Sequence, residues 1–242
     1  MIRKIGVWVF GFLFSLTLGA AIGLYIGHMS TSYEFLNKNI LPIVEKNYIN
    51  ISENQTTQML YYLKYECFNK EEIYFDKLEG FNFTISCSDV SKLKSEDVVP
   101  YIGEKILNET YFKHYSCENL KSCWKENKMY FISEDFHKKI FEWFEYSVVA
   151  MLVFLALYVY LIGVADKALT SVGGIVLSES IPFFIITYLI SNYIPVSQYT
   201  SIVSDVSVNY YNFFLTLSII GAAMVTLGHF IRLFKNEHKK KH

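Results

Sequence analysis

The sequence lacks the residue patterns on which most enzyme sites depend. Only four cysteines occur among 242 residues, and no two of them form a Cys-x-x-Cys pair, which argues against disulfide-exchange chemistry. No His-Glu-x-x-His, nucleophile elbow or glycine-rich phosphate loop is present, and these patterns carry metal-dependent, acyl-transfer and phosphoryl-transfer chemistry. The net charge is only −1. We therefore expect no enzymatic activity, no catalytic residues, no cofactor, no metal site and no nucleic-acid partner.

Charged residues are also missing from four long stretches of the chain. These stretches are residues 5–33, 146–165, 170–194 and 206–231, and the third contains a single acid, Glu179. Each has the length of about 20 residues that is needed to cross a hydrocarbon core of about 30 Å. The first run also exceeds the about 7–15 apolar residues of a secretory signal peptide, so we expect it to be retained as an anchor. The sequence thus predicts a mainly α integral membrane protein with a bundle of four transmembrane helices.

The basic residues predict which side of the membrane each segment faces. The short segments that flank the four apolar runs contain eight Lys and Arg residues: Arg3, Lys4, Lys167, Arg232, Lys235, Lys239, Lys240 and Lys241. Short loops rich in Lys and Arg stay in the cytoplasm. We therefore expect both termini to be cytoplasmic. The predicted segments are 1–29 with helix 1, an extracellular domain over 30–145, and 146–242 with helices at about 146–165, 172–194 and 206–231 and a basic cytoplasmic tail.

The long segment between the first two apolar runs contains every cysteine and every Asn-x-Ser/Thr sequon. The cysteines are Cys67, Cys87, Cys117 and Cys123, and the sequons begin at Asn50, Asn54, Asn82 and Asn108. Disulfides and N-linked glycans form on the secretory side of the membrane. Residues 30–145 are therefore predicted to be extracellular at the cell membrane, in agreement with the basic flanks. A single sequon arises easily by chance, so the sequence leaves open which of the four carry glycans.

The four cysteines predict structural disulfides in a small α+β domain. Four cysteines allow three pairings, among which sequence does not choose; we favour the two short loops, Cys67 with Cys87 and Cys117 with Cys123. Residues 81–87 alternate between apolar and polar side chains, which predicts a strand. Helical spacing predicts helices over about 59–67 and 98–106, the second with Ser95 as its N-cap.

The first apolar run contains a stripe of small residues at every fourth position. Its members are Gly11, Ser15, Gly19, Gly23 and Gly27. Small residues at this spacing let another helix approach closely. The partner is either another helix of the same chain or a second copy of the chain in a homo-oligomer. The fourth run has a lesser counterpart in Ser218, Ala222 and Thr226, which we expect to receive the first helix.

Glu179 is the most costly residue of the apolar runs, because a carboxylate inside a bilayer costs about 3 kcal/mol on insertion scales. It lies between two serines and is followed by Pro182. One explanation is a helix broken near residues 178–182, where Glu179 lines an ion pathway. The other explanation is that the hydrocarbon span begins near Ile181, so that Glu179 lies at the cytoplasmic interface close to Lys167.

Two functions from different classes fit these patterns. The first is a cell-surface membrane scaffold or recognition protein, in which a glycosylated, disulfide-bonded outer domain packs with or binds a protein partner and the four helices anchor it in the lipid bilayer. The second is an oligomeric channel or transporter that uses the small-residue stripe and Glu179. Self-association through helix 1 or the outer domain is compatible with either. The apolar runs contain few polar residues, which favours the first function.

Overall fold

A computed structural model describes residues 2–41, 53–78, 81–115, 122–123, 128–193 and 200–240. The chain divides into two compact units. Unit 1 consists of Met1–Ile26 and Phe141–His242, and unit 2 of Gly27–Ile140. Most of the described residues are helical, and the only sheet among them has two strands.

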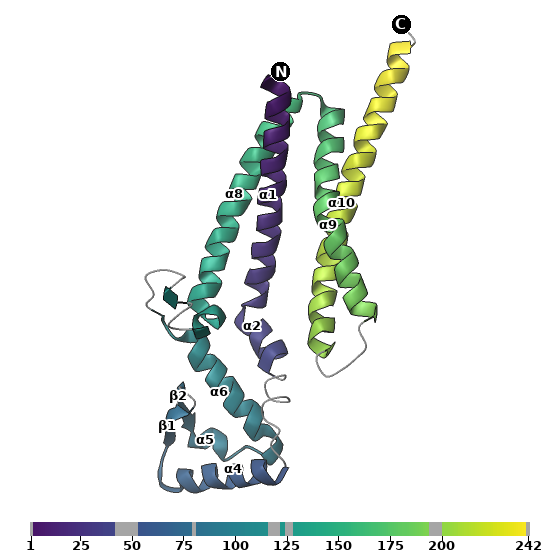
Figure 1. The fold of residues 1–242 in the computed structure, drawn as a ribbon. Helices are drawn as coiled ribbons and strands as arrows, with labels where there is room; N and C mark the ends of the chain where they lie inside the picture. Colours follow the sequence, from purple (N-terminus) through teal and green to yellow (C-terminus); the bar gives the residue numbers. More distant parts are fainter. Residues whose placement is uncertain are drawn as a thin grey trace. The chain divides into compact units, whose positions relative to one another are not determined.

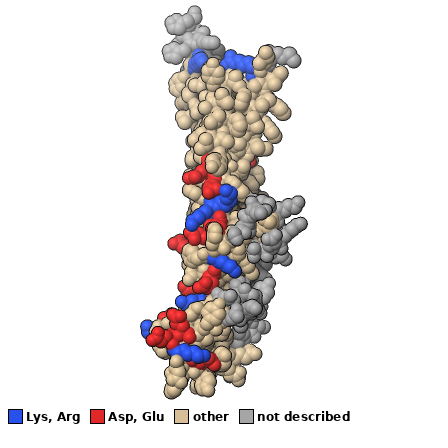
Figure 2. All heavy atoms as spheres, turned by 90° about the vertical axis from the view of Figure 1, so that its left-hand side faces the viewer, with Lys and Arg blue, Asp and Glu red and all other residues tan. Residues whose placement is uncertain are grey.

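Four long helices dominate the chain: α1 (Ile2–Ser30), α8 (Glu134–Ile162), α9 (Ala165–Tyr193) and α10 (Thr200–Lys240). Among the described residues, the segments long and apolar enough to cross a membrane are Ile2–Ser30, Glu134–Ile162, Ala165–Leu189 and Tyr210–Lys235. The four predicted apolar helices are thus confirmed, and they indicate a multi-pass membrane protein. On the face shown in Figure 2, the surface of unit 1 has no charged side chains over most of its length, and basic side chains lie at one end of it.

A two-residue turn joins α8 to α9 in unit 1. Gly163 ends α8 with a φ of +66°, and its amide donates to the carbonyl of Val159 over 3.0 Å. Glycine takes this left-handed conformation without the penalty that a Cβ imposes. Because the turn is so short, α9 begins at Ala165, earlier than the predicted residue 172. The beginning of α1 and the end of α10 lie at the same end of unit 1 as this turn (Figure 1).

The backbones of α9 and α10 are in direct contact, and the two helices lie side by side (Figure 1). A Cβ added to Gly173 would lie 2.7 Å from the carbonyl oxygen of Gly221. A Cβ added to Gly228 would lie 2.7 Å from the carbonyl oxygen of Asp166. Only glycine fits at these positions, and such close approach is how small residues stabilise helix pairs in membranes.

Unit 1 has an apolar core to which all four helices contribute residues. Its buried members are Phe14, Leu18, Ile22, Tyr158, Val172 and Phe214. The hydroxyl groups of Tyr158 on α8 and Ser171 on α9 hydrogen-bond to each other. Tyr210 of α10 donates to the carbonyl of Ile26 on α1 over 3.2 Å. These two hydrogen bonds satisfy tyrosine hydroxyls that an apolar surrounding would otherwise leave without a partner.

Unit 2 combines short helices with a hairpin. In chain order, its further elements are α2 (Tyr33–Phe35), η1 (Leu36–Ile40), α4 (Glu53–Glu66), η2 (Cys67–Asn69), β1 (Glu72–Leu78), β2 (Phe81–Ser86), α5 (Cys87–Val90), η3 (Ser95–Asp97), α6 (Val98–Phe112) and η4 (Lys128–Ile132). The predicted strand and the two predicted helices are therefore confirmed as β2, α4 and α6. Strand β1 was not predicted from the sequence.

The hairpin and three helices of unit 2 enclose an apolar core. β1 and β2 pair antiparallel, with Ile73 opposite Ile85 and Phe75 opposite Phe83. The buried core residues are Leu60, Leu63, Ile73, Phe83, Ile85, Val90, Val98 and Ile102. The alternation predicted for residues 81–87 is observed at Phe83 and Ile85, which are buried, whereas Thr84 between them is half-buried.

The start of α6 differs from the prediction. Ser95 does not cap this helix, because residues 95–97 form the 3-10 turn η3 ahead of it. The carboxylate of Asp97 instead accepts from the amide of Lys94 at the start of that turn, over 3.4 Å. Further along α6, the Tyr101 hydroxyl donates to Asp89 of α5 over 3.0 Å. Burial and this hydrogen bond raise the pKa of Tyr101 to about 12.

Candidate functional site

The most unusual polar contact of unit 1 joins the two features that the sequence singled out. Ser15 belongs to the small-residue stripe of α1, and its hydroxyl donates to Oε1 of Glu179 on α9 over 2.5 Å. The other carboxylate oxygen lies 3.4 Å from where a Cβ of Gly19 would stand. Both side chains are partly buried. The absence of a side chain at Gly19 therefore makes room for the carboxylate of Glu179.

Glu179 lies near the middle of its helix, which corrects two details of the sequence-based explanations: the nearby Lys167 and the broken helix. It is the fifteenth of the 25 residues in the apolar segment Ala165–Leu189. Lys167 is twelve residues away, which is about 18 Å along a helix, so it is no neighbour of the carboxylate. The helix is also not broken, since α9 continues through Pro182, whose ring removes one backbone hydrogen bond. The early start of α9 moves Glu179 away from the helix end.

The next residue along α9 makes a second interhelical hydrogen bond. Ser180 is fully buried, and its hydroxyl oxygen accepts from the hydroxyl of Ser218 on α10 over 3.0 Å. Glu179 and Ser180 thus connect α9 to α1 on one side and to α10 on the other. Ser218 was expected to receive the first helix, but it contacts α9 instead. Thr226 donates to carbonyls of its own helix.

The stripe of α1 does not serve as one contact surface within the chain. A Cβ at Gly11 would meet the ring of Tyr158 on α8 at 2.8 Å, whereas no atom lies within 4 Å of a Cβ at Gly23. In unit 2, a Cβ at Gly27 would be in ordinary contact with Ile140, at 3.7 Å. Side chains of α8 and α9, rather than a neighbouring backbone, occupy the stripe at Gly11, Ser15 and Gly19. A contact of the stripe with a second copy of the chain stays a prediction.

The glycines with the closest helix contacts were not singled out from the sequence. They are Gly173 on α9 and Gly221 and Gly228 on α10. A sequence pattern for these contacts was present. Gly221 and Gly228 are seven residues apart, so they lie on the same face of a helix, two turns from each other. The regular four-residue spacing on α1 was the more conspicuous pattern, but regular spacing does not by itself show where a partner helix lies.

One predicted disulfide is present in unit 2. Cys67 and Cys87 are joined, with their Cα atoms 5.3 Å apart, and the bond ties the end of α4 to the start of α5. Cys123 is also disulfide-bonded. Cys117 lies outside the described residues. No described cysteine is free.

Two of the four predicted glycan acceptors have described side chains. Asn54 on α4 and Asn108 on α6 are both exposed, as a glycan acceptor of a folded domain needs to be. Asn50 lies outside the described residues. Asn82 lies in β2, and its side chain is outside the described part.

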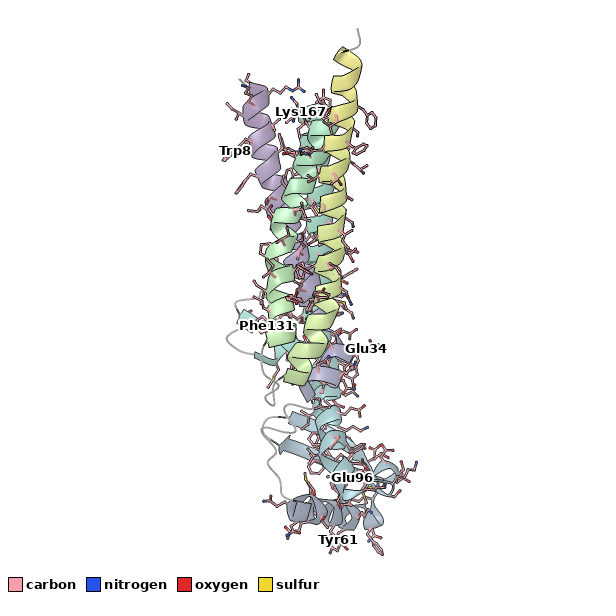
Figure 3. The ribbon with its side chains drawn as sticks, turned by 90° about the vertical axis from the view of Figure 1, so that its right-hand side faces the viewer. Trp8, Glu34, Tyr61, Glu96, Phe131 and Lys167 are labelled. Carbon is pink, nitrogen blue, oxygen red and sulfur yellow. A yellow bond between two sulfur atoms is a disulfide. The ribbon has the colours of Figure 1, made fainter. Side chains whose placement is uncertain are left out.

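Unit 2 presents a group of exposed aromatic side chains that sequence reasoning missed. Tyr61, Tyr62 and Tyr65 on α4 and Phe68 on η2 are 73%, 57%, 78% and 84% exposed. We call these four residues the aromatic surface. Figure 3 shows Tyr61 directed away from the body of unit 2. The opposite face of α4 carries Leu60 and Leu63 into the core, so this helix presents its aromatic rings from a fixed position.

Two histidines from distant parts of the sequence also meet in unit 2. The rings of His28 and His137 stack with centroids 4.0 Å apart, and the Thr31 hydroxyl lies 3.1 Å from Nδ1 of His137. This pair could not be predicted from the sequence, because the two residues lie on helices that are remote in the chain. Among the described residues, no three His, Cys, Asp or Glu side chains are grouped so that they could hold a metal ion.

Comparisons with known proteins give no relative for this chain. It matches no protein-family model, no curated protein and no solved structure.

Proposed function

We propose that this chain is a cell-surface scaffold or recognition protein, with no enzymatic activity of its own. In this proposal unit 2 is the extracellular part and binds a protein partner, while the four apolar helices anchor it in the cell membrane with both termini in the cytoplasm. The confinement of cysteines and sequons to residues 30–145 supports the orientation. The basic residues at the short flanks support it independently.

The observation that carries the proposal is the aromatic surface. Single exposed apolar residues are ordinary, but a contiguous exposed group marks an interaction site. Tyrosine and phenylalanine are enriched at protein interfaces, because a rigid ring buries a large area at a small cost in side-chain entropy. Tyr61 and Tyr65 are four residues apart and thus share one face of α4. Phe68 follows three residues later, next to Cys67. The disulfide of Cys67 would therefore hold this end of the aromatic surface in place when a partner binds.

The exposed sequon at Asn54 limits how a partner reaches this surface. Asn54 lies on the same helix as Tyr61, seven residues earlier, and so on the same face. Seven residues of helix span about 10 Å. A glycan on Asn54 would border the aromatic surface at one end and leave the end near Phe68 open to a partner.

The geometry at Glu179 favours an anchor over the alternative of a channel or transporter. A carboxylate that serves as an ion site needs oxygen atoms that are free to coordinate the ion. Here Oε1 is engaged by the Ser15 hydroxyl of a neighbouring helix. Glu179 therefore acts as a polar link between α1 and α9 in our proposal.

The orientation is tested by glycan and thiol accessibility in intact cells. We expect an endoglycosidase to increase the gel mobility of the wild-type chain, with the shift reduced by Asn54→Gln or Asn108→Gln. Membrane-impermeant reagents added after reduction should label the cysteines from outside. An unchanged mobility, together with labelling only in permeabilised cells, would place unit 2 in the cytoplasm and overturn the proposal.

The partner site is tested with a photo-crosslinking residue at Gln58, which is exposed on the same face of α4. We expect this probe to form a discrete crosslinked product on living cells. The product should disappear when Tyr61, Tyr65 and Phe68 are all replaced by serine. A probe at Lys92, which is also exposed in unit 2, is the control and should form no such product. If the triple replacement leaves crosslinking unchanged, the aromatic surface is not the partner site.

A further inference from the structure

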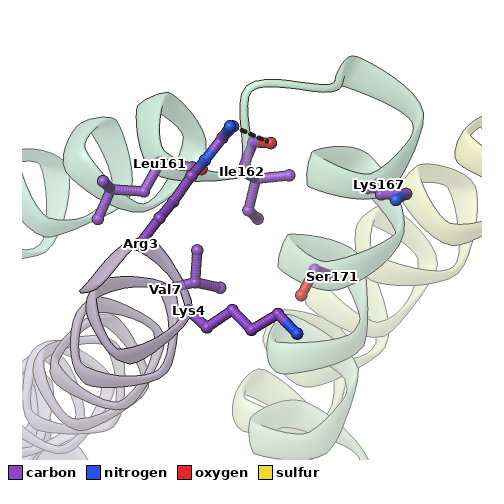
Figure 4. Close-up of a pocket in the computed structure, with 7 residues that line it drawn as sticks. All are labelled: Arg3, Lys4, Val7, Leu161, Ile162, Lys167 and Ser171. Carbon is purple, nitrogen blue, oxygen red and sulfur yellow. Dashed lines mark hydrogen bonds between the residues drawn. The ribbon is translucent and has the colours of Figure 1, made fainter. Parts of the chain in front are cut away.

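An open cavity lies at the end of unit 1 where α1 begins and α8 turns into α9. Its volume is about 580 Å³, within the range of about 300–1,000 Å³ for small-molecule sites. Figure 4 shows the residues that line it: Arg3, Lys4, Val7, Leu161, Ile162, Lys167 and Ser171. Three of these seven residues are cations and none is an acid.

The position of Arg3 is fixed by the end of α8. Its Nε donates to the carbonyl of Leu161 over 2.7 Å, and its Nη2 donates to the carbonyl of Ile162 over 2.9 Å. These carbonyls have no partner within the helix, and a cation there is favoured by the helix dipole. The guanidinium also contacts Gly163 where a Cβ would stand. Arg3 thus holds α1 against the turn and keeps one wall of the cavity in place.

The other two cations have no acidic partner within the described part of the chain. The ammonium group of Lys4 extends across the cavity toward α9, and Lys167 lies in the first turn of that helix (Figure 4). The neighbouring acid, Asp166, is oriented toward α10, where Lys235 lies 4.0 Å away. The positive charge of Lys4 and Lys167 is therefore available to an anion.

Besides the three cations and Ser171, the residues that line the cavity are apolar. Val7, Leu161 and Ile162 stand beside the three cations, on helices that are long and apolar enough to cross a membrane. A free phosphate ion would gain from the cations but not from these side chains. A phospholipid presents a phosphate next to its glycerol and acyl groups, so it matches both kinds of wall.

We propose that this cavity binds the phosphate headgroup of an anionic phospholipid. Arg3, Lys4 and Lys167 contact the phosphate, and Val7, Leu161 and Ile162 contact the glycerol and the first acyl carbons. Such a lipid would join α1 to the α8–α9 turn and so stabilise the bundle. The orientation proposed above places the cavity in the cytoplasmic leaflet, in which anionic lipids are enriched. The site itself requires only that the helices lie in a membrane and does not depend on any partner of unit 2.

The proposal is tested on the full chain in an uncharged detergent. Short-chain phosphatidylglycerol, short-chain phosphatidylcholine and inorganic phosphate are titrated separately while the unfolding temperature is measured, and native mass spectrometry counts the bound lipids. We expect phosphatidylglycerol alone to raise the unfolding temperature, with saturation at one bound molecule. Lys4→Gln and Lys167→Gln should each weaken this binding about fivefold, the effect of one basic residue near an anionic lipid. Neither lysine is buried, so the unfolding temperature without lipid should stay unchanged.

Arg232→Gln is the matched control, because it removes one exposed cation of α10 that does not line the cavity. It should leave the affinity for phosphatidylglycerol within twofold. An equal loss in Arg232→Gln would show that diffuse surface charge attracts the lipid and would overturn the site. Equal stabilisation by phosphatidylcholine, or no stabilisation by any of the three, would overturn it as well. Stabilisation by inorganic phosphate to the same extent would replace the lipid with a soluble phosphate as the ligand.

Discussion

The hydroxyl of Ser15 on α1 donates a hydrogen bond to the carboxylate of Glu179 on α9, over 2.5 Å. Both residues lie near the middle of their apolar helices, at position 14 of the 29 residues of α1 and position 15 of the 25 residues of the apolar part of α9. A polar group in the middle of a membrane-spanning helix is costly without a partner. The contact therefore satisfies the carboxylate and specifies how α1 and α9 are aligned.

A double-mutant cycle measures this link. We expect Ser15→Ala to destabilise unit 1 by about 1–2 kcal/mol, because it leaves the carboxylate without its donor. Glu179→Met retains a similar side-chain volume and removes the carboxylate, so Ser15→Ala should cost little in its presence. The cycle would be read from unfolding in detergent mixtures of increasing denaturing strength. Purely additive effects of the two changes would show that the hydrogen bond contributes nothing.

The anchor and channel functions differ in what Glu179→Gln does. Glutamine retains a side-chain oxygen that accepts from Ser15 and removes only the charge. In an anchor we expect the change to leave stability and membrane insertion unaltered and to affect no ion flux. In a channel it would alter the conductance or its pH dependence in liposomes. A selective conductance of the reconstituted wild-type chain that Glu179→Gln abolishes would favour the channel.

The sequence predicted the parts of this fold that depend on composition and local period. Uncharged apolar runs of about 20 residues predict membrane-crossing helices, so the four helices were located, although α8 begins at Glu134 rather than 146 and α9 at Ala165 rather than 172. The alternation at Phe83 and Ile85 identified β2 for the same reason. Strand β1 was missed because its outward residues include Tyr74, which is 64% exposed. An apolar residue on the solvent face obscures the period of two.

Contacts between helices could not be predicted, because they depend on which faces meet in space. The period of four on α1 is a local pattern, but Gly23 lies in open space while Gly173 and Gly221 are in contact. The contact between Ser15 and Glu179 could be predicted only if the length of the α8–α9 turn were known. Gly163 takes a positive φ in that turn, and α9 begins two residues later, at Ala165.

The disulfide between Cys67 and Cys87 is expected to stabilise unit 2 and leave unit 1 unaffected. The two cysteines are 20 residues apart, and closing a loop of this size contributes about 3 kcal/mol in the chain-entropy model. Replacing both with serine should lower the unfolding temperature of unit 2, as followed by proteolysis of residues 53–112 during heating. Thiol labelling of the denatured, unreduced wild type should detect no free cysteine. Two or more free thiols would contradict the disulfide assignment.

Tyr101 gives unit 2 a pH dependence in the alkaline range. Its pKa is raised to about 12 in the folded state, against about 10 for an unperturbed tyrosine. Between these values the unfolded chain has lost the proton that the folded chain retains, so stability falls as pH rises from about 10 to about 12. Tyr101→Phe should flatten that part of the stability profile, whereas Tyr61→Phe on the exposed surface should not. An identical profile for wild type and Tyr101→Phe would show that the hydrogen bond to Asp89 has no such effect.

Two adjacent glycines of α9 provide the sharpest test of helix packing in unit 1. A Cβ at Gly173 would lie 2.7 Å from a backbone oxygen of α10, whereas no atom lies within 4 Å of a Cβ at Gly174. Gly173→Ala should therefore destabilise unit 1 by about 1–3 kcal/mol, the usual cost of overpacking. Gly174→Ala should be neutral or stabilise by up to about 1 kcal/mol, because alanine favours the helix. Since the two variants add the same methyl group to neighbouring positions, helix propensity alone predicts equal effects. Equal unfolding temperatures in mild detergent would thus mean that α9 and α10 do not meet at Gly173.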